Sequence, residues 1–478
     1  MFFPLGPFEP DRSRHSNSAV QVATNVRPTI DGWGPLPALV GISDPLPSAP
    51  KGSVAVKTTN GTWDVYAGTV ANLYKLASDN SWTEISRVTD DYSLDASSGW
   101  WDFQLFGSNL VATALGSTYP QVLDIDTSGD FANLANATFE AENVFTAGDF
   151  LVFARVGGNN KKLKWSGVNN IEFWTPAQRG SGEQIFPSGG PIQAGLEQVG
   201  GSVIFQESEI RMMTFSPGSG LAFNFAPLDL ARGAFARRAI VPVGANDVIY
   251  LAKDGFYRNG TPIGAERIDK FFFGIVDKAD LAIGAADPYE KIAWFKFTDS
   301  ASVNYLLGYD WQLDRWLYSD QEVTDFLASA TAGYSLEQLS AFGTLDTLPY
   351  SLDSRFWKGA LPLFAGFNNA FEYGFFDGTN LEAVIETDDK MLIPGRRALT
   401  DTAIILGDTN SAQVRYGVRE KPGDNLSFTA YASQESDNRM IPLQVGGAQH
   451  RVGVKIPAAA TWSELTAIDV RFTDDGEF

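Results

Sequence analysis

A chain of 478 residues with 44% hydrophobic and 13% aromatic residues can build a large core, which excludes a globally disordered protein. It contains no cysteine, so disulfide frameworks, thiolate zinc sites and cysteine nucleophiles are excluded. The formal net charge of −21 argues against long-range attraction to nucleic acid or anionic lipid and is typical of a soluble, solvated surface.

Residues 1–50 are rich in proline and show no regular period, so a long helix is excluded there. They lack the basic region and continuous apolar stretch of a signal peptide. No run in the chain approaches the roughly 18 apolar residues of a spanning helix, so membrane insertion is not expected. Because Trp33, Leu36 and Leu39 would be costly in water, we expect an extended docking arm that these three residues anchor on the chain itself or on a neighbouring subunit.

Short apolar strands separated by polar turns begin at residue 51. The segment SVAVKTTNGTWDVYAG alternates around Asn60-Gly61, and ANLYKLASDNSWTEIS alternates around Asp79-Asn80. Both patterns are typical of β-hairpins, and together they predict one four-stranded sheet.

The same strand-turn pattern recurs along the chain, with turns at Gly107, Gly148, Gly200 and Gly244. A repeat of roughly 40–50 residues with about four strands per unit is typical of a β-propeller. We therefore predict an all-β protein with a degenerate propeller of about seven blades over residues 51–385, six or eight remaining possible. The best helical pattern lies over residues 324–341.

The last part of the chain, residues 386–478, has longer stretches that alternate apolar and polar residues, such as AQVRYGVRE and QHRVGVKI. Loops such as KPGDN separate them. This pattern predicts a C-terminal antiparallel β-sandwich of about six strands.

The sequence offers few candidates for catalysis or metal binding. The two histidines, His15 and His450, lie in polar, turn-like surroundings, and DIDTSGD begins like a calcium loop but has Ala135 where the bidentate acid is needed. Carboxylates such as Asp310 and Asp314 lie at predicted turns, where surface solvation is their usual role. We therefore predict a non-enzyme with no catalytic residue, metal or cofactor.

Two arginine clusters are candidate docking sites. The segment ARGAFARRA contains Arg232, Arg237 and Arg238, and GRRALTD contains Arg396 and Arg397. Either cluster could hold a phosphate or an acidic partner. In an acidic protein we favour salt bridges between subunits.

The N-terminal segment FEPDRSRHSNSAVQVATNVRPTIDGWGPLPAL resembles the start of tail nozzle proteins, also called tail tubular or hub proteins, of short-tailed bacteriophages. Over about the first forty residues the resemblance rests on short sequence motifs, and over the remainder it rests on the predicted architecture only. The matching residues are Pro10, Asp11, Asn25, Val26, Pro28, Asp31, Gly32, Trp33, Gly34, Pro35 and Pro37.

This resemblance implies a structural virion protein that is assembled in the host cytoplasm. Six copies would form a ring below the portal and the adaptor protein, and tail fibres or spikes would attach outside. DNA would only pass through the channel. The alternative is a glycan-binding or glycan-hydrolysing surface protein, in which tryptophans such as Trp100 and Trp101 stack on sugar rings rather than fill the blade core.

Overall fold

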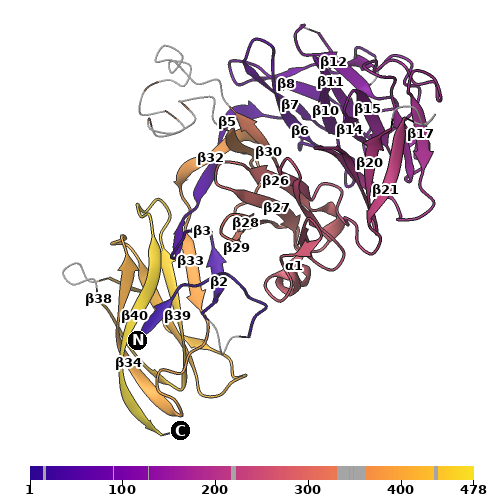
Figure 1. Ribbon diagram of the computed structural model, residues 1–478. Helices are drawn as coiled ribbons and strands as arrows, with labels where there is room; N and C mark the ends of the chain where they lie inside the picture. Colours follow the sequence, from indigo (N-terminus) through magenta and orange to yellow (C-terminus); the bar gives the residue numbers. More distant parts are fainter. Residues whose placement is uncertain are drawn as a thin grey trace.

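The computed structural model describes residues 1–13, 18–89, 91–127, 129–216, 222–330, 362–434 and 440–477, with the single positions 344, 348, 352 and 357. Nearly all regular structure in these residues is β, as the sequence predicts. Figure 1 shows a propeller and, beside it, a sandwich on which both marked chain ends lie.

The propeller has seven blades, which confirms the predicted fold class. Blades 1 to 5 are four-stranded antiparallel sheets of consecutive strands, and the first strand of each blade lies closest to the axis. Blade 1 contains β6 (Ser53–Lys57), β7 (Trp63–Gly68), β8 (Leu73–Leu76) and β9 (Trp82–Glu84), and blade 2 contains β10 (Asp102–Phe106), β11 (Asn109–Thr113), β12 (Gln121–Asp124) and β13 (Ala132–Asn133). Blade 3 contains β14 (Asn143–Ala147), β15 (Phe150–Ala154), β16 (Lys162–Trp165) and β17 (Gly182–Ile185), and blade 4 contains β18 (Ile192–Gln198), β19 (Gly201–Gln206), β20 (Ile210–Phe215) and β21 (Phe223–Asp229). Blade 5 contains β22 (Ile240–Gly244), β23 (Asp247–Leu251), β24 (Phe256–Arg258) and β25 (Thr261–Pro262).

Glycines make the tight turns that the sequence pattern predicts. Gly107 has φ 62° between β10 and β11, and Gly148 has φ 58° between β14 and β15. A side chain is disfavoured in this left-handed conformation, which suits the twisted two-residue hairpin turn. The four-stranded sheet predicted around Asn60-Gly61 and Asp79-Asn80 is blade 1.

Blades 6 and 7 connect the propeller to the rest of the molecule. Blade 6 contains β26 (Ile283–Asp287), β27 (Ile292–Thr298), β28 (Asn304–Asp310) and β29 (Arg315–Ser319). Blade 7 contains β30 (Asp325–Ala330), β31 (Pro362–Phe367), β32 (Glu372–Asn380) and, as its outer strand, β5 (Pro37–Pro45) from the N-terminal segment. The ring is therefore closed by pairing of two segments far apart in sequence.

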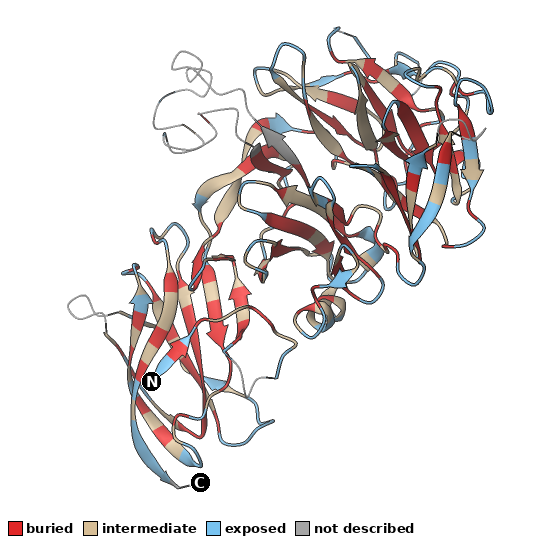
Figure 2. Cartoon of the chain, viewed as in Figure 1, coloured by how far each residue is buried: buried red, intermediate tan, exposed pale blue. Residues whose placement is uncertain are grey.

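The sandwich also takes strands from both ends of the chain. Its first sheet contains β3 (Val26–Pro28), β4 (Trp33–Pro35), β40 (Leu465–Glu477), β34 (Arg396–Gly407) and β38 (Met440–Gly447), with β1 (Phe2–Pro4) paired to β40. Its second sheet contains β2 (Val20–Thr24), β33 (Ala383–Thr387), β39 (Gln449–Ile456), β35 (Gln413–Arg419) and β36 (Ser427–Phe428), with β37 (Ala432–Ser433) paired to β35. Figure 2 shows buried positions between the sheets and an exposed far end of β34 and β40.

Strand β2 joins the two bodies. It pairs in parallel with β29 of blade 6, at Thr24 and Tyr318, and antiparallel with β33 of the sandwich. Blade 6 and the second sandwich sheet thus form one ten-stranded sheet. One buried apolar cluster also extends from Trp316 in the propeller to Val414 and Ile468 in the sandwich.

Two sequence expectations differ from the structure. The sequence predicts an arm (residues 1–50), a propeller (51–385) and a sandwich (386–478), but the first of these is not a separate unit. Strands β1 to β4 belong to the sandwich sheets, and β5 belongs to blade 7. The helix predicted from residue 324 is wrong where β30 forms, and the rest of that prediction, residues 331–341, lies outside the described residues.

The described helical segments are α1 (Asp269–Ile275) and the 3-10 turns Val156–Gly158 and Ala279–Leu281. In the described part of the chain no helix has the length and apolar character to span a bilayer.

Candidate functional site: an N-terminal clasp and a charged propeller axis

The predicted arm anchors all contact their own chain. Trp33 is fully buried in the apolar cluster between propeller and sandwich, and its indole Nε1 donates to the Gly6 carbonyl at 3.1 Å. Leu36 is also buried, and Leu39 is partly buried against the same cluster. We call residues 25–36, which lie between the two bodies, the clasp.

Asn25 begins the clasp in a left-handed conformation, with φ 57°. Asparagine tolerates this geometry better than other residues with a side chain. Its amide Nδ2 donates to Asp320 Oδ1 at 2.7 Å and to the Glu382 carbonyl at 3.0 Å, while its Oδ1 accepts from the Ser319 hydroxyl at 2.7 Å. One side chain therefore ties the end of blade 6 to the start of β33.

The turn at residues 29–32 is held from both sides. Arg315 of blade 6 donates to the carbonyls of Thr29 at 2.9 Å, Ile30 at 3.2 Å and Gly32 at 3.3 Å. A Cβ on Gly32 would lie 2.2 Å from the carbonyl oxygen of Leu465 in β40, so only glycine fits without a shift of the backbone.

The Pro10-Asp11 motif has a separate role at α1. The Asp11 carboxylate accepts the backbone N–H groups of Lys270 at 2.7 Å and Phe271 at 2.9 Å, which are the second and third residues of that helix. A carboxylate in this place satisfies donors that the helix leaves unpaired. Burial and the nearby Asp11 charge raise the pKa of Asp269 to about 6.

A second candidate site lies where the innermost strands begin. Charged side chains from six of the seven blades, or from the segments that lead into them, meet there, with one indole. We call this group the axial cluster; its members are Lys51, Asp95, Trp100, Asp102, Glu142, Arg155, Arg237, Arg238, Lys296 and Asp325.

Arg237 connects three blades within the axial cluster. Its guanidinium pairs with Glu142 of blade 3, which also accepts from Arg155 Nε at 2.9 Å, and it donates to the Ser98 carbonyl ahead of blade 2 at 3.3 Å. The charge of this predicted docking residue is thus paired inside its own chain.

Arg238, which stands just ahead of blade 5, contacts side chains of blade 7 and of the segment ahead of blade 2. Its Nη2 is 3.3 Å from Asp325 Oδ1, and Asp325 Oδ2 accepts from the Ser53 hydroxyl at 2.9 Å. Its guanidinium carbon lies 3.4 Å from the centre of the Trp100 ring. Arg238 therefore occupies one face of Trp100, and Trp101 is buried in the blade core with its Nε1 bonded to the Thr69 carbonyl.

Burial disfavours charge throughout the axial cluster. It raises the pKa of Asp102 to about 6, against the opposing effects of the Val144 N–H and Arg238, and it lowers the pKa of Arg238 to about 10. It also lowers the pKa of Lys296 to about 8, although the Asp325 carboxylate opposes this change. Groups with such shifts in one place are candidates for function.

The other predicted arginines lie nearer the surface. Arg232 is paired with Asp254 at 3.3 Å and stacks on Tyr257. Arg396 is paired with Asp474 at 2.5 Å, and Arg397 with Glu420 and with Asp475 at 3.4 Å, at the far end of β34 and β40. These pairs are a third to a half exposed, so they contribute little stability and can exchange partners.

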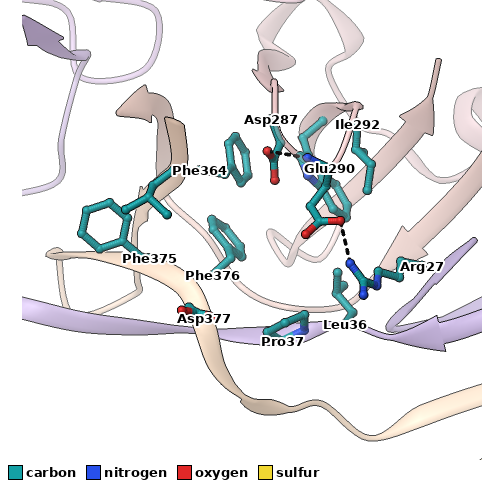
Figure 3. A pocket seen from close by; sticks show the side chains of 12 residues that line it. Arg27, Leu36, Pro37, Asp287, Glu290, Ile292, Phe364, Phe375, Phe376 and Asp377 are labelled. Atoms are coloured by element: carbon teal, nitrogen blue, oxygen red, sulfur yellow. Dashed lines mark hydrogen bonds and ion pairs between the residues drawn. The ribbon is translucent and has the colours of Figure 1, made fainter. Parts of the chain in front are cut away.

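A small cavity lies between blades 6 and 7 and the clasp. Figure 3 shows the rings of Phe364 and Phe376 on one side and Arg27 on the other, where Arg27 is bonded to Glu290 at 2.6 Å. Its volume is about 50 Å³, which gives room for no more than a few water molecules.

The remaining catalytic and metal candidates are not brought together. Asp310 accepts the N–H groups of Gln312 and Leu313 in its own turn, and Asp314 accepts from Tyr309 and Arg267. His450 is buried beside the Gly447 carbonyl, whereas His15 lies outside the described residues. Among the described residues, no group of His, Asp and Glu side chains is placed to hold a metal ion.

Sequence reasoning missed most of the axial cluster and a buried ion network in the sandwich. There Asp389 accepts from Arg419 at 2.5 Å and from Arg451 at 2.8 Å, and all three side chains are nearly inaccessible. One signal was present in the sequence: charged residues occur just before or at the start of inner strands, as with Asp102 and Asp325.

Comparison with known proteins finds distant structural likeness only. No family model and no curated protein matches the chain. Streptogramin B lyase is similar at 10% identity and a TM-score of 0.36, over 61% of this chain and 90% of that one. The β-propeller domain of Myceliophteria thermophila Swd1 is similar at 7% identity and a TM-score of 0.30, over 56% and 99%. An exo-beta-1,3-galactanase from Phanerochaete chrysosporium is similar at 10% identity and a TM-score of 0.29, over 91% and 99%. At these scores the likenesses carry no functional argument.

Proposed function

We propose that this chain is a structural subunit of a phage tail nozzle, present in six copies around the DNA channel and in contact with an adaptor protein and with fibres or spikes. The observation that carries the proposal is the role of the matching N-terminal residues. Asp11, Asn25, Gly32 and Trp33 fasten the propeller and the sandwich to each other. A rigid subunit of this kind suits a conduit that must keep its shape while DNA passes.

The charge of the chain supports the same proposal. With a net charge of −21, carboxylates that face a channel would repel the phosphates of DNA. DNA would then slide without sites that hold it. Tight, salt-sensitive binding of duplex DNA by the purified chain would contradict this part of the proposal.

The direct test is assembly with the adaptor protein. We expect native mass spectrometry and negative-stain class averages of the mixture to give a six-membered ring with a central hole. A chain that stays monomeric after mixing with adaptor rings would overturn the proposal.

The arginines at the far end of the sandwich allow a sharper test. If Arg396 and Arg397 exchange their own carboxylates for those of a neighbour, the variant Arg396→Ala/Arg397→Ala should remain folded and lose ring formation. The exposed Lys421→Ala is the matched control, and it should assemble normally. If the double variant forms normal rings, these arginines are not required at the subunit interface.

Glycan binding is the second candidate, and one observation favours it. An open groove of about 540 Å³ between blades 3 and 4 is lined by Trp165 and Phe225 together with the polar side chains of Glu183, Gln184 and Arg211. Aromatic rings beside amide and carboxylate groups are suited to sugars. Glycan-array binding that is lost in Phe225→Ala, with no ring formed with the adaptor, would favour this function over the nozzle.

A further inference from the structure

The axial cluster contains N–H donors without acceptors. Within the described residues, the Lys296 ammonium forms no hydrogen bond or ion pair, and Arg238 Nη1 and Trp100 Nε1 are buried with no hydrogen-bond partner. A buried donor that lacks an acceptor is costly, and an ionised one costs more. All three lie in one neighbourhood, since Arg238 stacks on Trp100 and the charges of Arg238 and Lys296 influence each other.

The nearby carboxylates are already engaged. Asp325 uses one oxygen for Ser53 and the other for Arg238, and Glu142 is shared by Arg155 and Arg237. Asp102 accepts the Val144 N–H at 2.9 Å. Among the described residues, none of these acids accepts a hydrogen bond from Arg238 Nη1, Trp100 Nε1 or the Lys296 ammonium.

The charge of the cluster differs in sign from that of the whole chain. Its members are five cations and four carboxylates, whereas the chain carries a net charge of −21. The Arg238 side chain is 26% exposed, so solvent reaches the cluster. Lys51 also belongs to this neighbourhood; its ammonium donates to the Ala96 carbonyl at 2.5 Å and has further hydrogens to donate.

We propose that the axial cluster binds a small oxyanion, a phosphate or a carboxylate, held by Arg238, Lys296 and the Trp100 indole, with Lys51 beside them. Such a ligand supplies the acceptors that the three unpaired donors lack, through charge-assisted hydrogen bonds. This inference does not depend on the proposed nozzle function, because the site lies inside one propeller and needs no second subunit.

Binding should be linked to protonation of Lys296. The charged groups that face it are Asp325, Arg238 and Lys51, and burial sets its pKa at about 8. An anion binds the ammonium form, so affinity should fall as the pH rises above about 8 and Lys296 loses its proton.

The test uses the full chain at constant ionic strength, with inorganic phosphate and acetate as separate probes and chloride as the reference salt. We expect phosphate, acetate or both to raise the melting temperature saturably, and calorimetry to give the dissociation constant. In Lys296→Met the constant should rise at least tenfold, while the exposed Lys57→Met should bind like the unchanged chain.

Two results would overturn the proposal. One is a melting temperature that depends on ionic strength but not on the identity of the anion. The other is equal binding by Lys296→Met and Lys57→Met. Should Lys296→Met fail to fold, the unchanged chain still decides the matter, because pH-independent anion affinity between pH 7 and pH 9 also contradicts it.

Discussion

The clasp and the axial cluster both join segments that are far apart in sequence, but they do so with opposite chemistry. The clasp buries Trp33 and Val26 completely and pairs the polar atoms of Asn25. The axial cluster brings together charges whose pKa values burial shifts, and it leaves donors unpaired. Buried apolar surface contributes stability directly, whereas buried ion pairs often return little more than the cost of desolvation. The difference indicates that the clasp contributes to stability, and it agrees with the proposal that the axial cluster binds an anion.

The largest expected effect is at the centre of the clasp. Trp33→Ala should lower the free energy of unfolding by about 3–5 kcal/mol, since it leaves a cavity in the shared core and an unpaired Gly6 carbonyl. Urea unfolding followed by tryptophan fluorescence measures it. Ile30→Ala in the adjacent turn is the control; that side chain is 78% exposed, so its change should stay within about 0.5 kcal/mol. Equal effects of the two substitutions would contradict the conclusion that the buried side chain of Trp33 stabilises the clasp.

A smaller effect should follow at the turn against β40. Gly32→Ala should cost about 1–3 kcal/mol, because its Cβ would overlap the Leu465 carbonyl. The control is Gly274→Ala in α1, where a Cβ meets open space and should stabilise the chain by about 0.5–1 kcal/mol. Thermal unfolding of both variants should therefore give shifts of opposite sign.

The axial cluster can be tested through the pH dependence of stability. The folded-state pKa of Asp102 is about 6, above its ordinary value of 3.8, so the folded state binds the proton more tightly. The contribution of Asp102 to the free energy of unfolding should therefore fall as the pH rises from 4 to 6. Asp102→Asn removes this loss and should be the more stable variant above pH 6, by on the order of 1–2 kcal/mol.

Urea unfolding at pH 4.5 and pH 7.5 checks this prediction. Asp31→Asn, at the exposed turn of the clasp, is the matched control for the substitution itself. If Asp102→Asn destabilises the chain at neutral pH, the carboxylate is a net stabilising partner of the cluster's cations and the comparison must be revised.

The smallest effect is expected at the far end of the sandwich. Arg396→Ala should change the free energy of unfolding by less than about 1 kcal/mol, because its pair with Asp474 is exposed and screened. Thermal unfolding of the single chain is sufficient to measure it. A loss of several kcal/mol would mean that this end of β34 and β40 is a structural joint like the clasp.

The propeller was predictable because its signals are local. Gly107 and Gly148 mark hairpins whose partners are adjacent in sequence, and the repeat of these hairpins indicates blades. Strand β5 was hidden because it lies in a proline-rich segment, although Pro37 and Pro45 occupy its two ends, where an outer strand tolerates proline. Helix α1 was hidden because it has only seven residues and is capped by Asp11 from a distant segment.

The candidate sites were less predictable because they are assembled from distant segments. Arg237 and Arg238 were recognised as a cluster, but nothing local in the sequence pairs them with Glu142 and Asp325. The partners come from separate blades, so only the closed ring brings them together. Trp33 was recognised as an anchor for the same reason that it is buried: a large aromatic residue among prolines has no local core to enter.

The closure of blade 7 by β5 also sets an order of events during synthesis on the ribosome. Ser43 of β5 is bonded to Tyr373 of β32, which is translated 330 residues later. At a rate of about 5–20 residues per second, the N-terminal segment must wait for roughly 20–70 s before its partner strand is synthesised. Until then the backbone hydrogen-bonding groups of β5 lack this partner strand and are open to neighbouring nascent chains, which favours aggregation of the unfinished chain at high concentration.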